Sequence, residues 1–366
     1  MSDEFSRNTV QMIDGKPVSQ EDADLLAFLQ ESAPKIAVIG SGGAGSNTIN
    51  RMTEVGIEGT TIIAMNTDAQ HLLKTKAKKK LLLGKKKTRG LGAGSNPAVG
   101  EAAAEESYSE LTALLKGYDL VFVTCGMGGG TGTGSAHVIA RAAKEAGALC
   151  VGVCTIPFTS EGPKRMQNAM VGLEKLKQSA DTVIVIPNDK LLMFAGDLPL
   201  NSAFRTSDMV LTNSVKGITE LITKPGLVNL DFADLRTILE KSGTAMIGLG
   251  EVGTKEQRDR VITAAEKALS SPLLDLEVTN ADKALINITG GSDMTLGEAE
   301  AAVQAISSRI SKDAHVIWGA AIDNDMEDTS VRVLAVITGI KQGRNSDGSA
   351  HSVEERAEEP IDLEFL

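Results

Sequence analysis

The sequence predicts an α/β fold in which a parallel sheet carries helices on both faces, followed by a long helix and a second, α+β domain. Three observations lead to this prediction. Short apolar runs alternate with helical patterns through the first 200 residues, as in parallel sheets. Glycine-rich turns follow several of these runs where a helix begins. The chain of 366 residues is long enough for two domains that each bury a core.

The first half of the chain alternates between strands and helices. Helical patterns occupy residues 46–55 and 136–146, and apolar runs predict strands at residues 36–39, 61–66, 120–124, 149–155 and 182–187. In a parallel sheet of this kind, ligands bind beyond the carboxyl ends of the strands. The glycine-rich turns all lie at such ends, which indicates a ligand site there.

The run GMGGGTGTGS at residues 126–135 is the strongest functional signal. It lies between an apolar strand and a helical pattern, which is not the setting of a flexible linker. Backbone N–H groups in such a turn and the amino end of the helix attract anions. Glycines also let a phosphate approach the backbone. The run therefore predicts a phosphate-binding turn in preference to a purely structural one.

Two further glycine turns precede this run. Gly40, Gly42 and Gly45 fit the pattern G-x-G-x-x-G, and Asp68 ends the next strand at the spacing of a ribose-binding acid. The other turn is RGLGAGSNP at residues 89–97. The Walker pattern is absent, which excludes a P-loop NTPase. An NAD(P)-binding fold is the alternative, although three glycine turns exceed what a dinucleotide fingerprint needs.

Seven motifs, in order, resemble the tubulin/FtsZ superfamily and, within it, the FtsZ family. The first four are GGAGSN (42–47), NTDAQ (66–70), TRGLGAGSNP (88–97) and GGGTGTG (128–134). The last three are PFTSEGPKRM (157–166), IPNDKLL (186–192) and NLDFADLRTIL (229–239). The short acidic ends favour the archaeal type. The resemblance implies a Rossmann-like parallel-sheet GTPase domain that binds GTP or GDP, with Mg²⁺ as the expected metal.

The resemblance also implies which residues contact the nucleotide. By resemblance, the glycine turns at residues 128–134 and 42–47 bind the phosphates, and the turn at residues 93–95 faces the γ-phosphate. Glu161 and Arg165 fall to the ribose and phosphate region. Phe204 stacks on the base, and Asp208 accepts hydrogen bonds from guanine. Alternatively, Phe204 is a core aromatic and Asp208 a solvated helix charge. The implied set is Gly42, Gly43, Ala44, Asn47, Asn66, Asp68, Ala93, Gly94, Ser95, Gly128, Gly129, Gly130, Thr131, Gly132, Thr133, Glu161, Arg165, Phe204 and Asp208.

The second half of the chain predicts a long helix and then a smaller domain. The helix covers residues 202–222 and is ended by Pro225 and Gly226. Further helices are predicted at residues 232–241, 255–269 and 296–311, and strands at 244–249, 283–289, 315–320 and 331–337. This pattern predicts an α+β domain.

The candidate catalytic residues, Asn229, Asp231 and Asp234, follow the long helix. A helix of about twenty residues spans roughly 30 Å, so these carboxylates cannot reach a phosphate bound at the helix start. By resemblance, they act on the nucleotide of the next subunit in a head-to-tail filament, where Asp231 and Asp234 polarise the attacking water. Such a heterologous contact repeats without closing. Asp231 is also a candidate N-cap of helix 232–241, which leaves water activation chiefly to Asp234.

These observations predict a GTP-hydrolysing cytoskeletal protein that polymerises with itself and forms the cell-division ring. The expected organisation is a flexible acidic extension (1–33), a GTP-binding domain (34–201), a central helix (202–224), a GTPase-activating α+β domain (225–340) and a disordered acidic tail (341–366). An NAD(P)-dependent oxidoreductase would leave GGGTGTG and NLDFAD unused. A scaffold that binds nucleotide but hydrolyses it poorly is a third possibility, which the presence of Asp231 and Asp234 disfavours.

The net charge of −11 is concentrated at the two ends. Residues 1–33 carry −5 and residues 341–366 carry −4, which leaves −2 for the body. The final segment, from Ile361 to Leu366, alternates apolar and acidic residues after a polar spacer, which suits capture in a partner's groove. By resemblance, the partner is a membrane-tethering adaptor, and a frayed terminus is the alternative.

Composition predicts a cytoplasmic protein, and the resemblance implies that it acts at the midcell division site. No apolar run approaches the roughly 18 residues of a membrane span, and no secretory signal is recognisable. Residues 74–89 hold nine Lys or Arg. Because aromatic residues are not interleaved there, we interpret them as a solvated sheet edge and expect no nucleic-acid partner. The three cysteines are expected to be buried, with no metal site.

Overall fold

The computed structural model describes residues 12–13, 16–17, 33–57, 59–195, 200–224, 226–228, 230–253, 259–274, 278–323, 326 and 329–339, with only the backbone for 12–13, 16–17, 192–195 and 200–207. The strands are β1 Met12–Ile13, β2 Lys16–Pro17, β3 Ile36–Ser41, β4 Thr60–Asn66, β5 Lys79–Leu82, β6 Leu120–Gly126, β7 Leu149–Ile156, β8 Thr182–Pro187, β9 Gly243–Val252, β10 Lys283–Gly290, β11 His315–Ile322 and β12 Val331–Thr338. The helices are α2 Gly42–Val55, α3 Ala69–Lys74, α4 Lys85–Thr88, α5 Pro97–Glu106, α6 Tyr108–Leu115, α7 Thr131–Glu145, α8 Pro163–Ser179, α9 Asn188–Ala195, α10 Leu200–Thr223, α11 Phe232–Leu239, α12 Arg260–Leu269 and α13 Leu296–Ser307. Short 3₁₀ turns, η1 and η2, occupy Thr159–Glu161 and Val278–Asn280.

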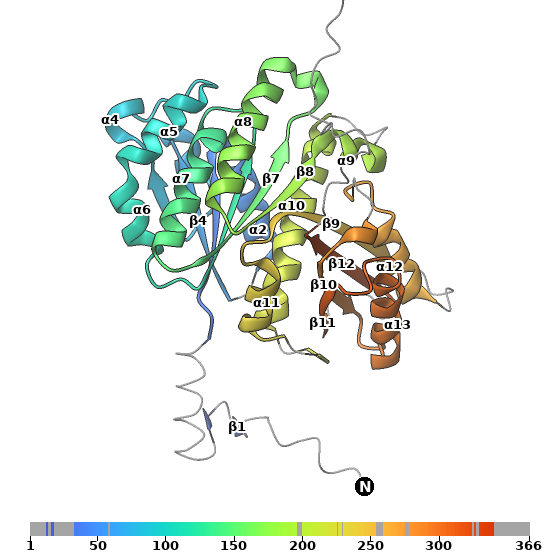
Figure 1. Ribbon diagram of the computed structural model, residues 1–366. Helices are drawn as coiled ribbons and strands as arrows, with labels where there is room; N and C mark the ends of the chain where they lie inside the picture. Colours follow the sequence, from blue (N-terminus) through green and yellow to red (C-terminus); the bar gives the residue numbers. More distant parts are fainter. Residues whose placement is uncertain are drawn as a thin grey trace, which may run out of the picture.

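A ten-stranded sheet organises the molecule, in the order β11-β10-β12-β9-β8-β7-β6-β3-β4-β5 (Figure 1). The six strands from β8 to β5 pair only in parallel. Their carboxyl ends therefore lie at one edge of the sheet, and the glycine turns follow these ends. The predicted parallel sheet is confirmed.

Helices cover both faces of the parallel strands. On one face, α2, α10 and α11 share an apolar core with β3, β6 and β7. On the other face, the apolar sides of α5, α6, α7 and α8 pack against the alternate residues of the same strands. The strands β3, β6 and β7 are buried on both sides, which explains their continuous apolar runs in the sequence.

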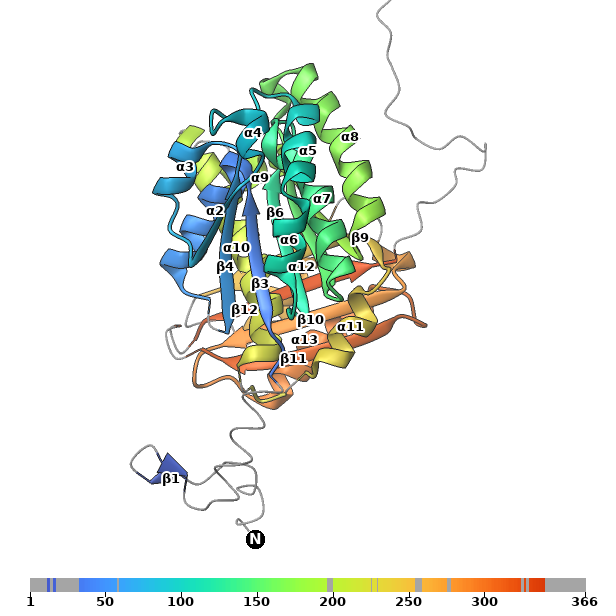
Figure 2. The same ribbon diagram turned by 90° about the vertical axis from the view of Figure 1, so that its left-hand side faces the viewer.

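The C-terminal strands form the other part of the sheet, where β9, β12 and β10 pair antiparallel and β10 and β11 pair in parallel. In Figure 2 these strands run across the direction of the parallel strands. Three residue pairs, from Thr182 with Gly243 to Ile184 with Ala245, join β8 to β9 in parallel. This junction makes the sheet continuous, which the sequence did not predict. The helix α10 contacts α2 on one side and β10 and β11 on the other.

Two helices begin earlier than predicted. The sequence predicted starts at residues 46 and 136, whereas α2 begins at Gly42 and α7 at Thr131. Glycine disfavours helices, so the pattern predicted late starts. In the structure, glycines in the first turns of both helices pack closely against neighbouring backbone. A Cβ on Gly45 would lie 2.7 Å from the carbonyl oxygen of Thr124, and one on Gly134 would lie 2.1 Å from that of Pro97. The glycines are helical because only they fit these contacts.

The other helices and strands that were predicted individually lie close to their predicted positions, although α12 begins at Arg260 and residues 255–258, predicted as its start, lie outside the described residues. The long helix predicted at 202–222 is α10. The helix α13 ends at Ser307, four residues short of its predicted end. The strand β5 forms the sheet edge, and Lys79 and Lys80 on it are exposed, which confirms the edge interpretation of the basic cluster. The domain boundaries stay predictions. Within the described residues, no helix combines the length and apolarity that crossing a bilayer requires.

Candidate functional site

The turn between β6 and α7 folds back onto the first turn of α7. Gly128 has a φ of +97°, a conformation that favours glycine. Its N–H donates to the hydroxyl of Thr133 over 2.8 Å. The first turns of α7 and α2 contain no acidic residue. The positive ends of both helices are therefore left to attract an anion.

The glycine turns pack against each other at backbone distance. A Cβ on Gly42 would lie 2.7 Å from the nitrogen of Gly132, and one on Gly100 would lie 2.3 Å from the carbonyl oxygen of Gly130. A Cβ on Gly130 would lie 2.8 Å from the nitrogen of Asn96. Gly129 differs, because its chain neighbours apart, no atom of the described residues would lie within 4 Å of its Cβ. Its neighbours hold the backbone in place, whereas Gly129 faces open space.

A cavity of about 340 Å³ opens beside Gly129, at the carboxyl ends of the strands. Its wall combines backbone of the glycine turn, the first turn of α2, and side chains from the loops that follow β7 and β8. Sixteen residues line it: Gly43, Ala44, Asn47, Gly126, Met127, Gly129, Gly130, Thr131, Gly132, Thr155, Pro157, Glu161, Arg165, Asn188, Asp208 and Leu211. Twelve of the lining positions are glycine, alanine or polar residues other than Asp208, as expected where backbone and polar groups contact a ligand.

Asp208 lines this cavity from α10. Its Oδ1 accepts a hydrogen bond of 3.0 Å from the Thr48 hydroxyl on α2. Burial raises the pKa of the Asp208 carboxyl to about 6, while the hydrogen bond from Thr48 and the nearby charge of Arg51 lower it. The carboxylate is thus a half-buried acceptor that is ionised at neutral pH.

Glu161 and Arg165 line the cavity from η1 and α8. Their side chains form an ion pair, one turn apart along the chain. Glu161 also accepts a hydrogen bond of 2.9 Å from the N–H of Phe158, which fixes the loop after β7. The two residues predicted for the ribose and phosphate region therefore lie together at the cavity, with about half of the Arg165 side chain (51%) exposed.

Several predicted residues stand behind the cavity wall. The carboxylate of Asp68 caps α3 by accepting a 2.9 Å hydrogen bond from the N–H of His71. Asn66 accepts a hydrogen bond of 3.2 Å from the N–H of Asp68. The third glycine turn, residues 93–95, packs against Gly130. Gly94 and Ser95 there have φ values of 56° and 58°.

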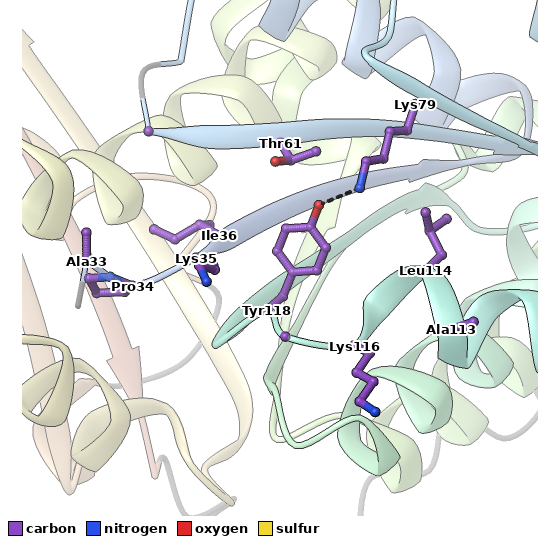
Figure 3. A pocket seen from close by; sticks show the side chains of 12 residues that line it. Ala33, Pro34, Lys35, Ile36, Thr61, Lys79, Ala113, Leu114, Lys116 and Tyr118 are labelled. Atoms are coloured by element: carbon purple, nitrogen blue, oxygen red, sulfur yellow. Dashed lines mark hydrogen bonds between the residues drawn. The ribbon is translucent and has the colours of Figure 1, made fainter. Parts of the chain in front are cut away.

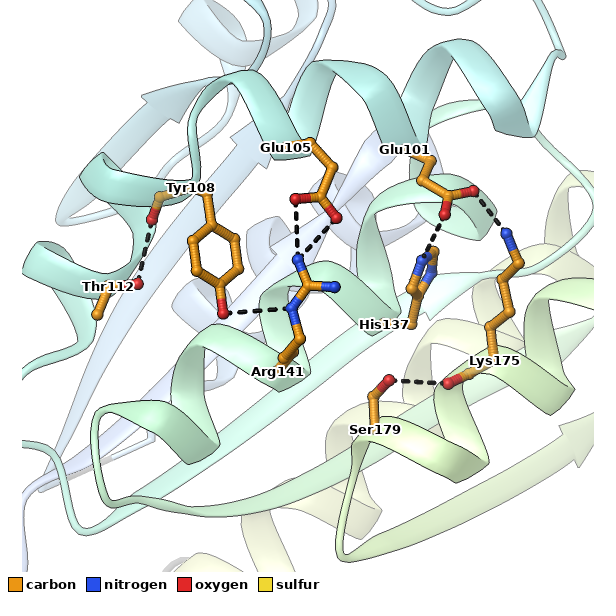
Figure 4. A network of polar contacts seen from close by, with 8 residues as sticks. All are labelled: Glu101, Glu105, Tyr108, Thr112, His137, Arg141, Lys175 and Ser179. Atoms are coloured by element: carbon orange, nitrogen blue, oxygen red, sulfur yellow. Dashed lines mark hydrogen bonds and ion pairs between the residues drawn. The ribbon is translucent and has the colours of Figure 1, made fainter.

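A polar network behind the glycine turns joins α5, α7 and α8 (Figure 4). Glu101 on α5 contacts His137 on α7 over 3.1 Å and Lys175 on α8 over 2.6 Å. Arg141 donates to both carboxylate oxygens of Glu105, over 2.7 and 2.8 Å. Burial lowers the pKa of His137. The network fixes α5, which follows the glycine turn at residues 89–97, against α7, which follows the glycine turn after β6.

The chain matches two family descriptions. Residues 35–196 match the Tubulin/FtsZ family, GTPase domain, and residues 243–341 match the FtsZ family, C-terminal domain. The chain is 54% identical over 335 residues to cell division protein FtsZ 1 of Archaeoglobus fulgidus, covering 92% of this chain and 90% of the relative. The chain belongs to the FtsZ family. The family consists of tubulin-like, filament-forming GTPases of cell division, which excludes the oxidoreductase alternative.

Solved structures agree with this assignment. An empty FtsZ dimer from M. jannaschii is 53% identical, with a TM-score of 0.83 over 88% of this chain and 93% of that one. CetZ2 from Haloferax volcanii, in a protofilament with bound GTPγS, has a TM-score of 0.72 at 20% identity over 86% of this chain and 95% of that one. At that identity the likeness supports the fold alone.

The FtsZ-family acids predicted for catalysis lie far from the cavity. Asp231 is the N-cap of α11, and its Oδ1 accepts a 2.7 Å hydrogen bond from the N–H of Asp234, which confirms the predicted cap. Both side chains are exposed. In Figure 1, α11 lies toward the end of the molecule opposite the glycine turns. Asp208 lies fifteen residues before the end of α10, or roughly 20 Å along the helix axis.

Two predicted residues cannot be placed in this way. Asn229 lies outside the described residues, and so does the side chain of Phe204, although its backbone belongs to α10. The acidic ends, including the segment from Ile361 to Leu366, also lie outside them.

A larger cavity, of about 590 Å³, lies at the amino ends of β3 and β4. Figure 3 shows Lys35, Lys79 and Lys116 around it, with the amine of Lys79 donating to the Tyr118 hydroxyl over 3.2 Å. Neither a glycine turn nor the start of a helix lines it. It is therefore not the counterpart of the carboxyl-end cavity, despite its size.

Some lining residues escaped the sequence analysis. Thr155 near the end of β7, Asn188 just after β8 and Leu211 one turn after Asp208 all line the carboxyl-end cavity. The rule that ligands bind at the carboxyl ends of parallel strands was sufficient to find the first two. Thr48 was missed because no local signal links it to Asp208, 160 residues away.

Proposed function

We propose that GTP binds in the carboxyl-end cavity. The backbone of Gly128–Thr133 and the start of α2, with Gly42, Gly43, Ala44 and Asn47, hold the phosphates. Residues 93–95 approach the γ-phosphate, supported by the network around Glu101. Glu161 and Arg165 contact the ribose and phosphate region. The support is the set of groups that meet at one cavity: two helix starts without acidic residues, the open face of Gly129, and a half-buried carboxylate.

The base is recognised by Asp208. An ionised carboxylate only accepts hydrogen bonds, and guanine offers two adjacent donors, N1–H and the 2-amino group. Adenine offers no such pair. Phe204, at the preceding turn of α10, stacks on the base. Asn66 and Asp68 act indirectly, by fixing α3 and the turn beside the cavity.

The expected metal is Mg²⁺ carried by the nucleotide. Within the described residues no group of three or more His, Cys, Asp or Glu is arranged to hold a metal ion. This fits Mg²⁺, which keeps several waters and binds mainly through substrate phosphates. Asn47 and Thr131 line the cavity with oxygen donors of the kind that Mg²⁺ accepts. When bound, the ion would neutralise charge on the β- and γ-phosphates.

Hydrolysis takes place between two subunits. Asp231 and Asp234 are exposed and lie beyond the far end of α10, so they cannot approach a nucleotide bound by the same chain. In a head-to-tail filament they meet the nucleotide of the next subunit, together with Asn229. Asp231 holds the helix start, and Asp234 polarises the attacking water. Residues 225–340 thereby activate the GTPase of the neighbour, and loss of the γ-phosphate loosens the contact.

Phosphate release from GTP, measured against protein concentration with Mg²⁺ present, tests this proposal. Activity per molecule should rise from near zero above a threshold. Asp234→Ala should lower turnover by about 100-fold or more and leave GTP binding intact. Glu174→Ala is the matched control, because among the described residues that exposed carboxylate pairs with Lys177 alone, on its own helix. Unchanged turnover in Asp234→Ala, or constant activity per molecule, would overturn the shared site.

The acidic tail docks the filament to a membrane-tethering adaptor, which places the protein at the midcell division site. The support is the alternation of apolar and acidic residues from Ile361 to Leu366 after a polar spacer. Deleting these six residues should leave assembly and turnover unchanged and remove adaptor binding. Undiminished binding by the shortened chain would contradict this role.

A further inference from the structure

A buried hydroxyl on α2 contacts the carboxylate that faces the base. Thr48 is completely buried, and its Oγ1 lies 3.0 Å from Oδ1 of Asp208. The same hydroxyl lies 3.2 Å from the carbonyl oxygen of Ala44, one turn earlier on α2. One O–H can donate fully to only one of the two, and an ionised acceptor forms the stronger hydrogen bond. The contact with Asp208 is therefore favoured while that carboxyl is ionised.

The contact restricts how Asp208 can present its oxygens. A carboxylate has about four acceptor sites on two oxygens, and Thr48 occupies one of them. The α10 backbone and this hydrogen bond together limit rotation of the carboxylate. The remaining acceptor sites are then presented in a fixed direction, as two adjacent donors of a planar base require.

The contact with Thr48 also affects whether the Asp208 carboxyl is ionised. Burial favours the protonated form of Asp208, and Thr48 and Arg51 on α2 oppose it. Glu161 and Arg165 line the same cavity, and Asp189 on α9 accepts hydrogen bonds from Thr159. Protonated Asp208 would carry a donor on one oxygen and could not accept from both guanine donors.

We propose that Thr48 is a positioning residue for guanine recognition: by donating to Oδ1 of Asp208 it orients the carboxylate toward the two donors of the base edge. This inference rests on the proposed contact between Asp208 and guanine. It predicts that Thr48 sets the preference for guanine over hypoxanthine, which keeps N1–H but lacks the 2-amino group.

The test compares the affinities of GDP and IDP in the full-length chain. Thr48→Val replaces the hydroxyl with a methyl group of similar size. This variant should bind GDP about tenfold more weakly and IDP less so, which lowers the ratio of the GDP affinity to the IDP affinity. Thr48→Ser keeps the hydroxyl and should restore the ratio. Thr53→Val is the control on the same helix, because within the described part of the chain the Thr53 hydroxyl contacts the carbonyls of Ile49 and Lys76 and not Asp208.

A second readout separates positioning from general damage to α2. Thr48→Val should move the midpoint of GDP binding to higher pH, because one of the two influences that hold the pKa of Asp208 down is gone. Equal weakening of GDP and IDP with no change of midpoint would overturn the proposal. Thr48→Ala serves the same test if the valine variant folds poorly.

Asp208→Asn distinguishes failure of this inference from failure of the base contact. If Asp208→Asn keeps the preference for GDP, the contact between Asp208 and guanine is wrong. If Asp208→Asn loses the preference and Thr48→Val keeps it, the base contact stands and the role of Thr48 is wrong. If both lose it and Thr48→Ser regains it, the inference is supported.

Discussion

The two ends of the parallel sheet differ in how completely one chain builds them. At the carboxyl end, Asp208 is half-buried and held by Thr48, and Glu161 is held by Arg165 and a backbone N–H. Close-packed glycines fix the backbone between them. At the opposite end, Asp231 and Asp234 are exposed on the first turn of α11. At one end a single chain surrounds a cavity with fixed groups, and at the other end it presents two exposed acids.

This difference indicates which half of a reaction each end can perform. A nucleotide needs a cavity with fixed donors, which the carboxyl end has. Water activation needs a carboxylate close to the phosphate, and under the proposed function the exposed pair supplies it to the neighbour's nucleotide. The larger cavity at the amino ends of the strands is lined, among the described residues, by three lysines but by no glycine turn, helix start or carboxylate. Cavity size is therefore a poor guide here, and the direction of the strands is a good one.

Mixing two inactive variants tests the comparison most severely. Asp234→Ala keeps a sound cavity, and Gly129→Asp places a negative charge where Gly129 faces open space. Each alone should hydrolyse almost no GTP. In an equal mixture, about a quarter of random head-to-tail contacts join an intact cavity to an intact Asp234. Phosphate release should recover toward that fraction, and a mixture that stays inactive would place the whole site within one chain.

Two adjacent glycines sharpen the description of the carboxyl end. Gly130→Ala should lower the free energy of unfolding by about 1–3 kcal/mol, because its Cβ would meet the nitrogen of Asn96 at 2.8 Å. Gly129→Ala should leave the free energy of unfolding unchanged. It should weaken GTP binding by about tenfold or more, because the added methyl would occupy the space proposed for a phosphate. Denaturant unfolding and nucleotide titration measure the two effects. Full GTP affinity in Gly129→Ala would mean that the phosphates lie elsewhere.

Titration of Asp208 separates binding from stability. Because its pKa is about 6, GDP should bind about tenfold more weakly at pH 5 than at pH 7. The folded pKa lies above the unfolded one, so the contribution of Asp208 to stability is greatest at low pH and is lost as pH rises through about 6. Binding and stability should therefore change in opposite directions. Asp208→Asn is the control, because it keeps the titration of the nucleotide phosphates but lacks that of Asp208. In this variant the stability trend should disappear, and any pH dependence of GDP binding that remains belongs to the phosphates.

Local patterns predicted most of the fold. Apolar runs and glycine turns located the parallel strands, and their common carboxyl end located the cavity. The long-range details could not be predicted in this way. No local rule pairs Thr182 with Gly243 or Thr48 with Asp208, because these contacts depend on how distant elements pack. The roles of Glu161 and Asp208 came from the resemblance to the FtsZ family, since isolated carboxylates carry no local signal.

The smallest expected effect concerns the end with the exposed acids, where a structural role and a chemical role share one residue. Asp231→Ala removes the cap of α11 and should lower the free energy of unfolding by about 1 kcal/mol. Asp231→Asn keeps a capping oxygen and should leave stability unchanged, while turnover falls if the negative charge acts on the neighbour's nucleotide. Thermal unfolding and phosphate release, measured on both variants, separate the two roles. Equal turnover in Asp231→Asn and the parent chain would restrict Asp231 to capping and leave water activation to Asp234 alone.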